Sequence, residues 1–447
     1  MDSTHDLIFP QKFLFGSAVA AFQVEGDGGK RKTDWDLFLN HHPTIVKPNE
    51  KGPEWWTQKN AEKDIQTMQS LGMQVQRLSL EWGRIEPEEG VINDKAIAYY
   101  KEVITYIKSL HMTPMITLNH YVLPEWIARK GGWAHKDILQ YFTRFVALVL
   151  SHFSDVEYWI TLNEPNFLLD AGYLTHSYPP QTGNLITGFY VRHYMIEAHK
   201  RAYALIKKNI PTSQIGIAFA LRWDAPENPK DPLENFYAKA LNYIENYNFI
   251  KAMQPADFIG CNYYTGYYLN LNFLKPRPSK NIDNRSIQQT KMFAELEKPG
   301  TYDTDFGWPI VPEFLLQLLR SLYKTFKLPI LITENGLADK EDKYRSFYIL
   351  THLVAVWQAI QEGIPVKQYI HWSTIDNLEW LEGYRMHFGL IKLNPVTGER
   401  KLQQSAHLYS AIAKYKKIEV EKLMKEYLDE EQQKKALEVI KKLLMKI

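Results

Sequence analysis

The sequence predicts an α/β fold, a closed (β/α)8 TIM barrel in a single domain, on three observations. Short apolar runs that resemble strands alternate with long amphipathic helices through most of the 447 residues. Eight such strand–helix pairs are the number that closes a barrel of parallel strands. Two of the predicted strands are followed directly by an acidic residue, and ligands bind at this carboxyl end of parallel strands. A doubly wound open sheet would also fit the alternation.

The predicted strands are short and bounded by turn-forming residues. They span residues 13–19, 75–80, 115–118, 158–162, 215–220, 258–264, 329–333 and 366–372. The predicted helices span residues 53–71, 94–110, 136–153, 185–208, 234–253, 311–326, 343–361 and 402–415. Ile65, Met68 and Leu71 share one face of the first helix, Asp94 is the expected cap of the second, and Pro211 ends the fourth. A long polar stretch, 274–304, precedes the sixth helix, and the longer loops follow the first, fourth, sixth and eighth strands.

We divide the chain into a barrel domain, 1–415, and a C-terminal helical extension, 416–447. The extension is rich in Lys, Glu and Leu, and Leu437, Ile440, Leu444 and Ile447 share a helical face. Residues 429–435 interrupt the apolar stripe, which predicts one or two amphipathic helices. We expect them to pack on or near the barrel rather than to bind a partner.

Composition excludes several classes of function. The 53 basic and 51 acidic residues leave a net charge of +2, which predicts no nucleic-acid partner and no attraction to an anionic membrane. The single cysteine, Cys261, is typical of a reducing compartment, so we expect a cytoplasmic protein with neither signal peptide nor membrane span. The run GDGGKRKT lacks the Ser or Thr and the upstream Gly of a phosphate loop. With no HExxH motif and no cysteine cluster, we expect no metal and no cofactor.

The two acidic residues at strand ends are Glu334, in ITENG, and Glu164, in TLNEP. Either one alone would be interpreted as a helix cap, but two carboxylates across a barrel mouth are the minimum for cleaving a glycosidic bond. They need opposite protonation states. Arg77, on the second strand, is the candidate to keep Glu334 ionised, although it could instead pair with Glu81 or Glu86. Glu164 stands among apolar residues and is better placed to hold its proton.

These segments resemble glycoside hydrolase family 1, the retaining β-glycosidases, from about residue 13 to residue 415. The segments that carry the resemblance occur in the family's order: they are FLFGSAVAAFQVEG, HYVLPEW, TLNEP, DFIGCNYYTG, ITENG and HWSTIDNLEWLEGYRMHFGL. The resemblance implies a TIM barrel that acts on a small-molecule β-glycoside or oligosaccharide.

Roles at the site follow from the same resemblance. It implies that Glu334 is the nucleophile and that Glu164 is first the general acid and then the base. It also implies that Tyr264 orients the nucleophile through a hydrogen bond and that Arg77 keeps it ionised. The implied sugar-binding set comprises Gln23 and His120 for hydroxyls, Asn163 for the 2-hydroxyl, Glu379 with Trp380 for the 4- and 6-hydroxyls, Trp372 as an apolar floor, and Phe388. Without the resemblance, His120 and the two tryptophans would be interpreted as core residues and Gln23 as a loop anchor.

Three features depart from the family pattern. Tyr121 stands where the family usually has Trp, so we expect a sugar contact made there to weaken or move. The loop 27–35 is altered, which would reshape the entrance, and the tail after residue 415 extends beyond the usual family end.

The resulting hypothesis is a retaining exo-β-glycosidase acting on terminal β-linked glucose, galactose or fucose. Relatives that hydrolyse 6-phosphorylated sugars carry Ser, Lys and Tyr near the 6-position, where Glu379 would repel a phosphate. A transglycosidase or a non-catalytic sugar-binding protein on the same barrel would also fit the sequence. The aglycone and the oligomeric state are left open by the sequence.

Overall fold

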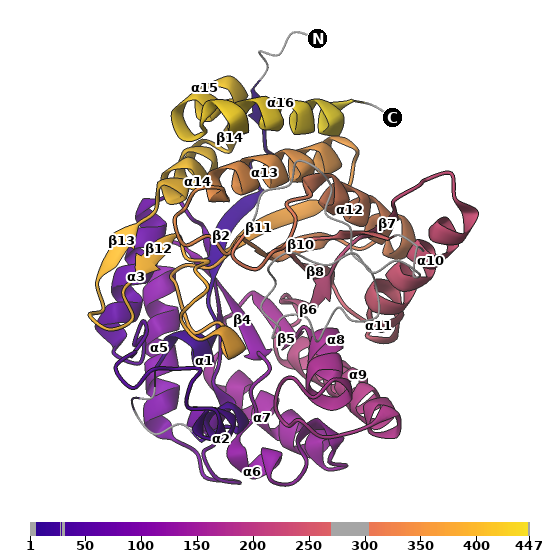
Figure 1. The fold of residues 1–447 in the computed structure, drawn as a ribbon. Helices are drawn as coiled ribbons and strands as arrows, with labels where there is room; N and C mark the ends of the chain where they lie inside the picture. The colour runs from indigo at the N-terminus through magenta and orange to yellow at the C-terminus, as the bar shows by residue number, and fades with distance from the viewer. Residues whose placement is uncertain (1–5, 27, 29–31, 270–303, 446–447) are drawn as a thin grey trace.

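The computed structural model describes residues 6–26, 28, 32–269 and 304–445. Parallel strands close into a barrel in the order β10-β11-β2-β3-β4-β5-β6-β8, which confirms the predicted TIM barrel and excludes an open sheet (Figure 1). The barrel strands are β2 (Leu14–Ala18), β3 (Val75–Ser79), β4 (Thr113–Asn119), β5 (Tyr158–Asn163), β6 (Gln214–Leu221), β8 (Phe258–Tyr263), β10 (Ile330–Asn335) and β11 (Val366–Trp372).

Helices surround the barrel and connect its strands. They are α3 (Gln58–Ser70), α5 (Asp94–Ser109), α7 (Ile138–His152), α9 (Leu185–Asn209), α10 (Pro232–Asn242), α11 (Asn248–Ala252), α12 (Pro312–Phe326), α13 (Arg345–Gln361) and α14 (Gln404–Tyr415). Asn93, rather than the expected Asp94, caps α5, because its side chain accepts from the N–H of Lys95. Helix α3 begins at Gln58, five residues after the predicted start at 53.

The predicted helix 234–253 is confirmed as a helical segment that spans residues 232–252, with one irregularity that the sequence did not predict. It is divided into α10, a π-helical turn η3 (Tyr243–Tyr247) and α11. Asn242 donates to the carbonyl of Asp224, and Asn246 donates to that of Arg222, each at 2.7 Å. A π turn is often found where side chains serve a neighbouring segment, and apolar periodicity does not register such tertiary bonds.

Two apolar cores lie on either side of the sheet. The inner core fills the barrel, with Val75, Met115, Ile160 and Leu331 among its residues. The larger outer core lies between the strands and the surrounding helices. A barrel filled in this way is a packed core and not a pore, so a ligand site must lie at one of its ends.

The longer loops follow the carboxyl ends of β2, β5, β8 and β11, as predicted, and therefore gather at one end of the parallel barrel. Short elements in the segments after β2, β3, β4, β5, β6, β8 and β11 are α1 (Ala21–Val24), α2 (Asp34–His41), α4 (Trp82–Ile85), α6 (Glu125–Ala128), η1 (Gly132–Ala134), α8 (Pro165–Leu168), η2 (Leu169–Leu174), β7 (Asp224–Pro226), β9 (Tyr267–Leu269), η5 (Trp380–Glu382), β12 (Ile391–Leu393) and β13 (Arg400–Leu402). Residues 27 and 29–31 of the altered loop, 274–303 of the polar stretch, and Ile447 lie outside the described residues.

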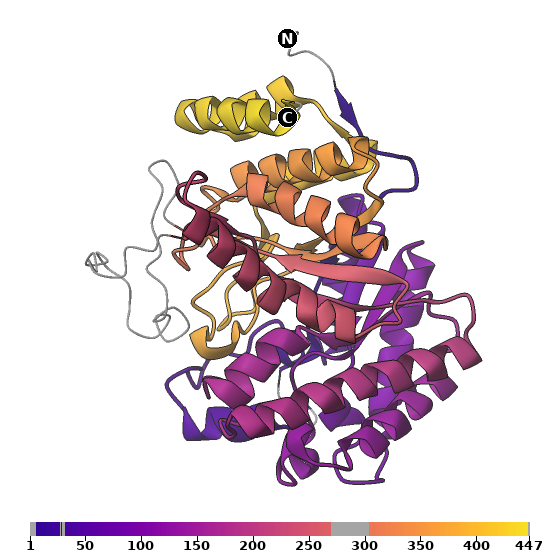
Figure 2. The same ribbon diagram turned by 90° about the vertical axis from the view of Figure 1, so that its right-hand side faces the viewer.

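The C-terminal extension forms two helices, α15 (Val420–Tyr427) and α16 (Glu430–Leu444). Helix α16 packs on α13 and α12 (Figure 2). Its buried residues are Gln432, Ala436, Ile440 and Leu443, and Leu437 and Leu444 of the predicted stripe are partly buried against the core. β1 (Leu7–Ile8) pairs with β14 (Lys417–Ile418), so both ends of the described chain lie beside this extension (Figure 1). The domain boundary at residue 415 stays a prediction.

Candidate active site

Glu334 lies inside β10, where the predicted strand 329–333 had already ended. Leu331 packs in the inner core, and Ile330 and Ile332 pack in the outer core. Strict alternation from Leu331 would turn Glu334 away from the barrel interior. The pairing of β10 with β8 shifts register between Ile332 and Glu334, and irregularities of this kind re-aim a side chain. The shift is why Glu334 faces the interior.

Both carboxylate oxygens of Glu334 accept short hydrogen bonds. Arg77, from β3, donates through Nη1 to Oε1 at 2.6 Å, and the hydroxyl of Tyr264, after β8, donates to Oε2 at 2.6 Å. Arg77 and Glu334 are 1% and 4% exposed, so this ion pair is shielded from water. Arg77 therefore pairs with Glu334, and neither Glu81 nor Glu86 forms an ion pair with it.

Glu164 follows β5 directly and has a left-handed backbone, with φ of 45°. The pairing of β5 with β6 shifts register between Ile160 and Asn163, just before this residue. The side-chain amide of Asn262 donates to Oε1 of Glu164 at 2.8 Å, and the hydroxyl of Tyr121 donates to Oε2. A non-glycine residue held in this backbone region is a feature that clusters at functional sites.

The two carboxyl groups have different surroundings, as paired catalytic carboxylates require. Burial, and then the charge of Glu334, raises the pKa of Glu164 to about 7, while hydrogen bonds from Tyr121 and Asn262 oppose this. Burial also raises the pKa of Glu334, but the charge of Arg77 and the bond from Tyr264 act against it. Only Glu334 has a cation in direct contact. Glu334 therefore ionises first, and Glu164 keeps its proton to higher pH.

A polar chain runs from Arg77 to His120. Nη2 of Arg77 donates to Oδ1 of Asn163 at 2.6 Å, and the amide of Asn163 lies 3.1 Å from Nε2 of His120. Burial and the charge of Arg77 lower the pKa of His120 well below its ordinary value, so its ring is neutral. Because Nε2 accepts from the amide, Nδ1 carries the ring proton. Nδ1 has no hydrogen-bond partner among the described residues.

Gln23 and Glu379 lie beside each other. The amide nitrogen of Gln23 donates to the carbonyl of Leu378 at 2.8 Å and contacts Oε2 of Glu379 at 3.4 Å. Its carbonyl oxygen is buried and has no partner in the described part of the chain. Burial, and then the charge of Glu334, raises the pKa of Glu379 to about 8.

Aromatic rings border these polar groups. The ring of His120 stacks 5.8 Å from Trp372 and 6.1 Å from Trp380. Phe388 lies edge-on to Tyr264 at 5.9 Å. Every predicted site residue is therefore placed at the carboxyl end of the barrel or in its loops.

Gly336 allows the strand that carries Glu334 to approach its neighbour. Gly336 is not among the glycines with positive φ, so its backbone angle does not require glycine. A Cβ at this position would instead overlap the carbonyl oxygen of Trp372. Close approach of β10 to the end of β11 is therefore why glycine is required.

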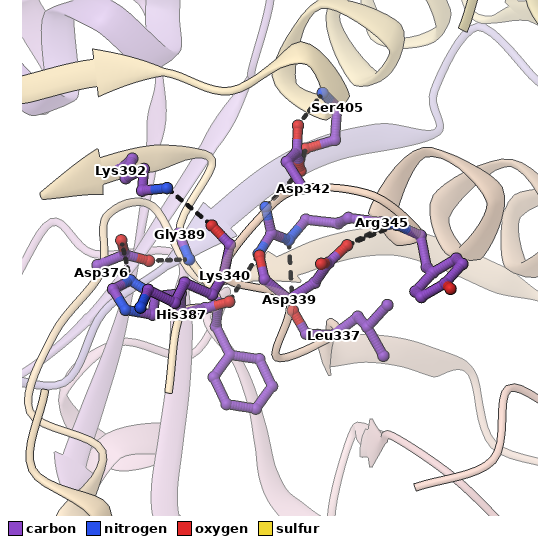
Figure 3. A network of polar contacts seen from close by, with 12 residues as sticks. Leu337, Asp339, Lys340, Asp342, Arg345, Asp376, His387, Gly389, Lys392 and Ser405 are labelled. Atoms are coloured by element: carbon purple, nitrogen blue, oxygen red, sulfur yellow. Dashed lines mark hydrogen bonds and ion pairs between the residues drawn. The ribbon is translucent and has the colours of Figure 1, made fainter. Parts of the chain in front are cut away.

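A buried polar network anchors the loop after β10 (Figure 3). Arg345 donates through Nη2 to the carbonyls of Asp339 at 2.7 Å and His387 at 2.6 Å, and through Nε to that of Leu337 at 3.3 Å. Nη1 of Arg345 bonds Asp342, whose other contacts reach Ser405 of α14. One guanidinium therefore joins the loop after β10 to the loop after β11.

Asp376 holds the second of these loops. Its carboxylate accepts from the backbone N–H of Gly389 at 2.8 Å and that of Leu393 at 3.1 Å, and contacts Nδ1 of His387 at 2.8 Å. In the sequence, Phe388 lies between His387 and Gly389, which both contact Asp376. The network thus supports the part of the mouth that carries Phe388.

We expect Arg345→Met to lower the free energy of unfolding by about 3–5 kcal/mol, because it leaves Asp342 buried without its cation. Chemical denaturation followed by tryptophan fluorescence measures this. The matched control is Arg385→Met, which removes an exposed ion pair with Glu382 and should cost less than about 1 kcal/mol. Equal losses in the two variants would contradict a structural role for the buried network.

Sequence reasoning missed two contacts at the site. Asn262 donates to both Glu164 and Asn163, and Tyr121 donates to Glu164. Asn262 precedes Tyr264 by two residues, and strand alternation places such pairs on one face. The position of Asn262 at the site could therefore have been predicted from the sequence. The contact of Tyr121 with Glu164 could not have been predicted in this way, because it depends on the backbone conformation of the loop after β4. Within the described residues, no cluster of His, Cys, Asp or Glu could hold a metal ion.

Comparisons with known proteins identify the family of the chain. The model of the family described as Glycosyl hydrolase family 1 matches residues 5–254 and 237–418. β-Glucosidase A of Thermotoga maritima is 31% identical, over 92% of this chain and 99% of its own. A 6-phospho-β-galactosidase of Lacticaseibacillus rhamnosus is 29% identical, over 89% and 96%. The solved structure of a β-glycosidase from Pyrococcus horikoshii is 31% identical, with a TM-score of 0.83 over 96% of this chain and 100% of that one. The chain is therefore a glycoside hydrolase and belongs to glycosyl hydrolase family 1.

Proposed function

We propose that this protein is a retaining exo-β-glycosidase, resembling β-glucosidases, that releases terminal non-reducing β-D-glycosyl residues. The observation that carries the proposal is the unequal pairing of two buried carboxylates. Glu334 has Arg77 in direct contact, and Glu164 has only neutral donors. One ionised and one protonated carboxyl group are the two reactants that glycosidic cleavage needs.

In the first step, Glu334 attacks the anomeric carbon while Glu164 gives its proton to the departing glycosidic oxygen. The bond to the aglycone breaks, and an ester to Glu334 forms. Glu164, now a carboxylate, then takes a proton from water, whose oxygen displaces Glu334 and restores both groups. Tyr264 and Arg77 hold the nucleophile in place before attack.

Unpaired polar atoms support a sugar in this site. Within the described part of the chain, the ring N–H of His120 is an unused donor, and the carbonyl of Gln23 is an unused acceptor. A buried polar atom without a partner is costly, and a sugar hydroxyl can both accept from the one and donate to the other. Trp372 and Trp380 supply apolar faces for the ring. The oriented amide of Asn163 is the proposed partner of the 2-hydroxyl.

The 6-phosphoglycosidase reaction is the second candidate, since one relative bears that name. A phosphate on the 6-hydroxyl would need cationic donors. The proposed partner there is Glu379, which forms no ion pair with a Lys or Arg of the described chain. Glu379 supplies no positive charge for a phosphate, and above its pKa of about 8 it would also repel one, so the geometry favours the unphosphorylated sugar.

We expect kcat/KM for p-nitrophenyl β-D-glucoside to exceed that for its 6-phosphate by at least about 100-fold. In assays above a pH of about 8, where Glu379 is ionised, the Glu379→Gln variant removes this charge and keeps the shape, so it should narrow the ratio. A preference of the unmodified enzyme for the phosphate would overturn the assignment. Values of kcat/KM for the corresponding galactoside and fucoside, measured in the same assay, rank the three sugars by preference of the enzyme.

The same reactions, followed by ¹H NMR, report the stereochemistry. Retention predicts that the β-anomer of the sugar appears first, and early α-anomer would mean inversion. Alcohol acceptors added to these tubes would reveal transglycosylation as alkyl glycoside. Binding without release of any sugar would favour a non-catalytic sugar-binding protein.

Cytoplasmic location stays a prediction. It rests on one cysteine, Cys261, which is buried and unpaired. Among the described helices, none has the length and hydropathy to span a membrane.

A further inference from the structure

We propose that Tyr121 is a positioning residue for the acid/base group, because its hydroxyl holds one oxygen of Glu164. The inference rests on the proposed role of Glu164. Tyr121 stands where the family usually has Trp, and the sequence predicted only that a sugar contact there would change. The structure points to a different consequence, a direct bond to the carboxyl group that must give and then take a proton.

The backbone and the surrounding rings fix Tyr121 in this orientation. It follows β4 with a left-handed φ of 70°, which few aromatic residues adopt, and is 5% exposed. Its ring lies 5.0 Å from Trp380, 5.8 Å from Phe167 and 6.0 Å from Tyr178. The hydroxyl can therefore turn little and donates to Glu164.

The bond acts on both steps of the reaction. A hydroxyl donor stabilises the ionised carboxylate more than the neutral acid, so it opposes the effect of burial on Glu164. Burial also keeps the pKa of Tyr121 well above its ordinary value, so Tyr121 remains a donor throughout. With Asn262 on the other oxygen, both oxygens of Glu164 are oriented. The hydrogen bond thereby limits the rise in the pKa of Glu164, so that the group can give a proton in the first step and take one in the second.

Other groups also act on Glu164. The titratable and charged groups around it are Arg77 from β3, His120 and Tyr121 after β4, Tyr178 after η2, Tyr264 after β8, Glu334 from β10 and Glu379 after β11. Tyr121 is the only titratable residue among them with a described hydrogen bond to Glu164. Removing its hydroxyl therefore changes one contact and leaves the other groups in place.

The test is Tyr121→Phe, with Tyr178→Phe as the matched control from the same aromatic cluster. In the unmodified enzyme kcat/KM should fall above a pH of about 7, as Glu164 loses its proton. Loss of a donor to the carboxylate raises its pKa, so Tyr121→Phe should move this fall upward by about one pH unit. Tyr178→Phe should leave it in place. An unmoved fall with a raised KM would instead make Tyr121 a sugar contact and overturn the proposal.

A second measurement separates this inference from the proposed function. ¹³C NMR of enzyme labelled at the glutamate carboxyls, with the Glu164 signal assigned by Glu164→Gln, follows the titration without any substrate. An upward shift in Tyr121→Phe, in a protein that hydrolyses no glycoside tested, supports the positioning contact and rejects the proposed activity. An unshifted titration rejects the positioning role, whatever the activity.

Discussion

Glu334→Gln is expected to lower kcat for p-nitrophenyl β-D-glucoside by roughly 10⁴- to 10⁶-fold, as loss of a covalent nucleophile does. An amide cannot attack the anomeric carbon, and it no longer carries the charge that Arg77 compensates. Initial rates at saturating substrate measure the loss. Thermal unfolding followed by circular dichroism checks that the variant is folded.

The matched control is Glu341→Gln, which changes an exposed carboxylate in the loop that follows the same strand and should keep full activity. In the unmodified enzyme, a 2-deoxy-2-fluoro glucoside should label one peptide, the one that contains Glu334. Activity retained by Glu334→Gln, or a label on another peptide of inactivated enzyme, would reject Glu334 as the nucleophile.

Glu164→Gln should produce a loss that depends on the leaving group. For a substrate with a poor leaving group, such as methyl β-D-glucoside, we expect kcat/KM to fall by about 10²- to 10⁴-fold, the usual contribution of a general acid. The fall should be much smaller for 2,4-dinitrophenyl β-D-glucoside, because dinitrophenolate departs without a proton. The fall in kcat/KM above a pH of about 7 should also disappear, since the titrating group is gone.

Glu157→Gln is the control for this variant, because Glu157 is exposed at the opposite end of β5. It should behave as the unmodified enzyme with every leaving group. An equal loss in Glu164→Gln for all leaving groups would contradict the acid role and indicate a general structural defect. Added azide, a nucleophile that needs no base, should restore turnover of the dinitrophenyl substrate.

Local pattern was sufficient for most of the barrel. The strand predicted at 366–372 coincides with β11, and that at 158–162 falls one residue short of β5. Apolar runs between turn residues are a local property, so their ends can be recognised in sequence. Within the predicted helix 234–253, the π turn η3 was missed, and there Asn242 and Asn246 bond the backbone of a separate segment. Apolar periodicity carries no information about such a partner.

By itself, the sequence determined the alternating strands and helices, the two glutamates at strand ends and Arg77 as a candidate cation, because strand pattern and residue chemistry are local. Strand pairing in the tertiary structure decided that the sheet closes into a barrel. Tertiary structure decided how these groups meet. The register shift before Glu334 turns its side chain inward, and the left-handed backbone of Tyr121 places a hydroxyl against Glu164. Both depend on how neighbouring strands and loops pack, and the energy of that packing arises from contacts between segments that are far apart in the sequence.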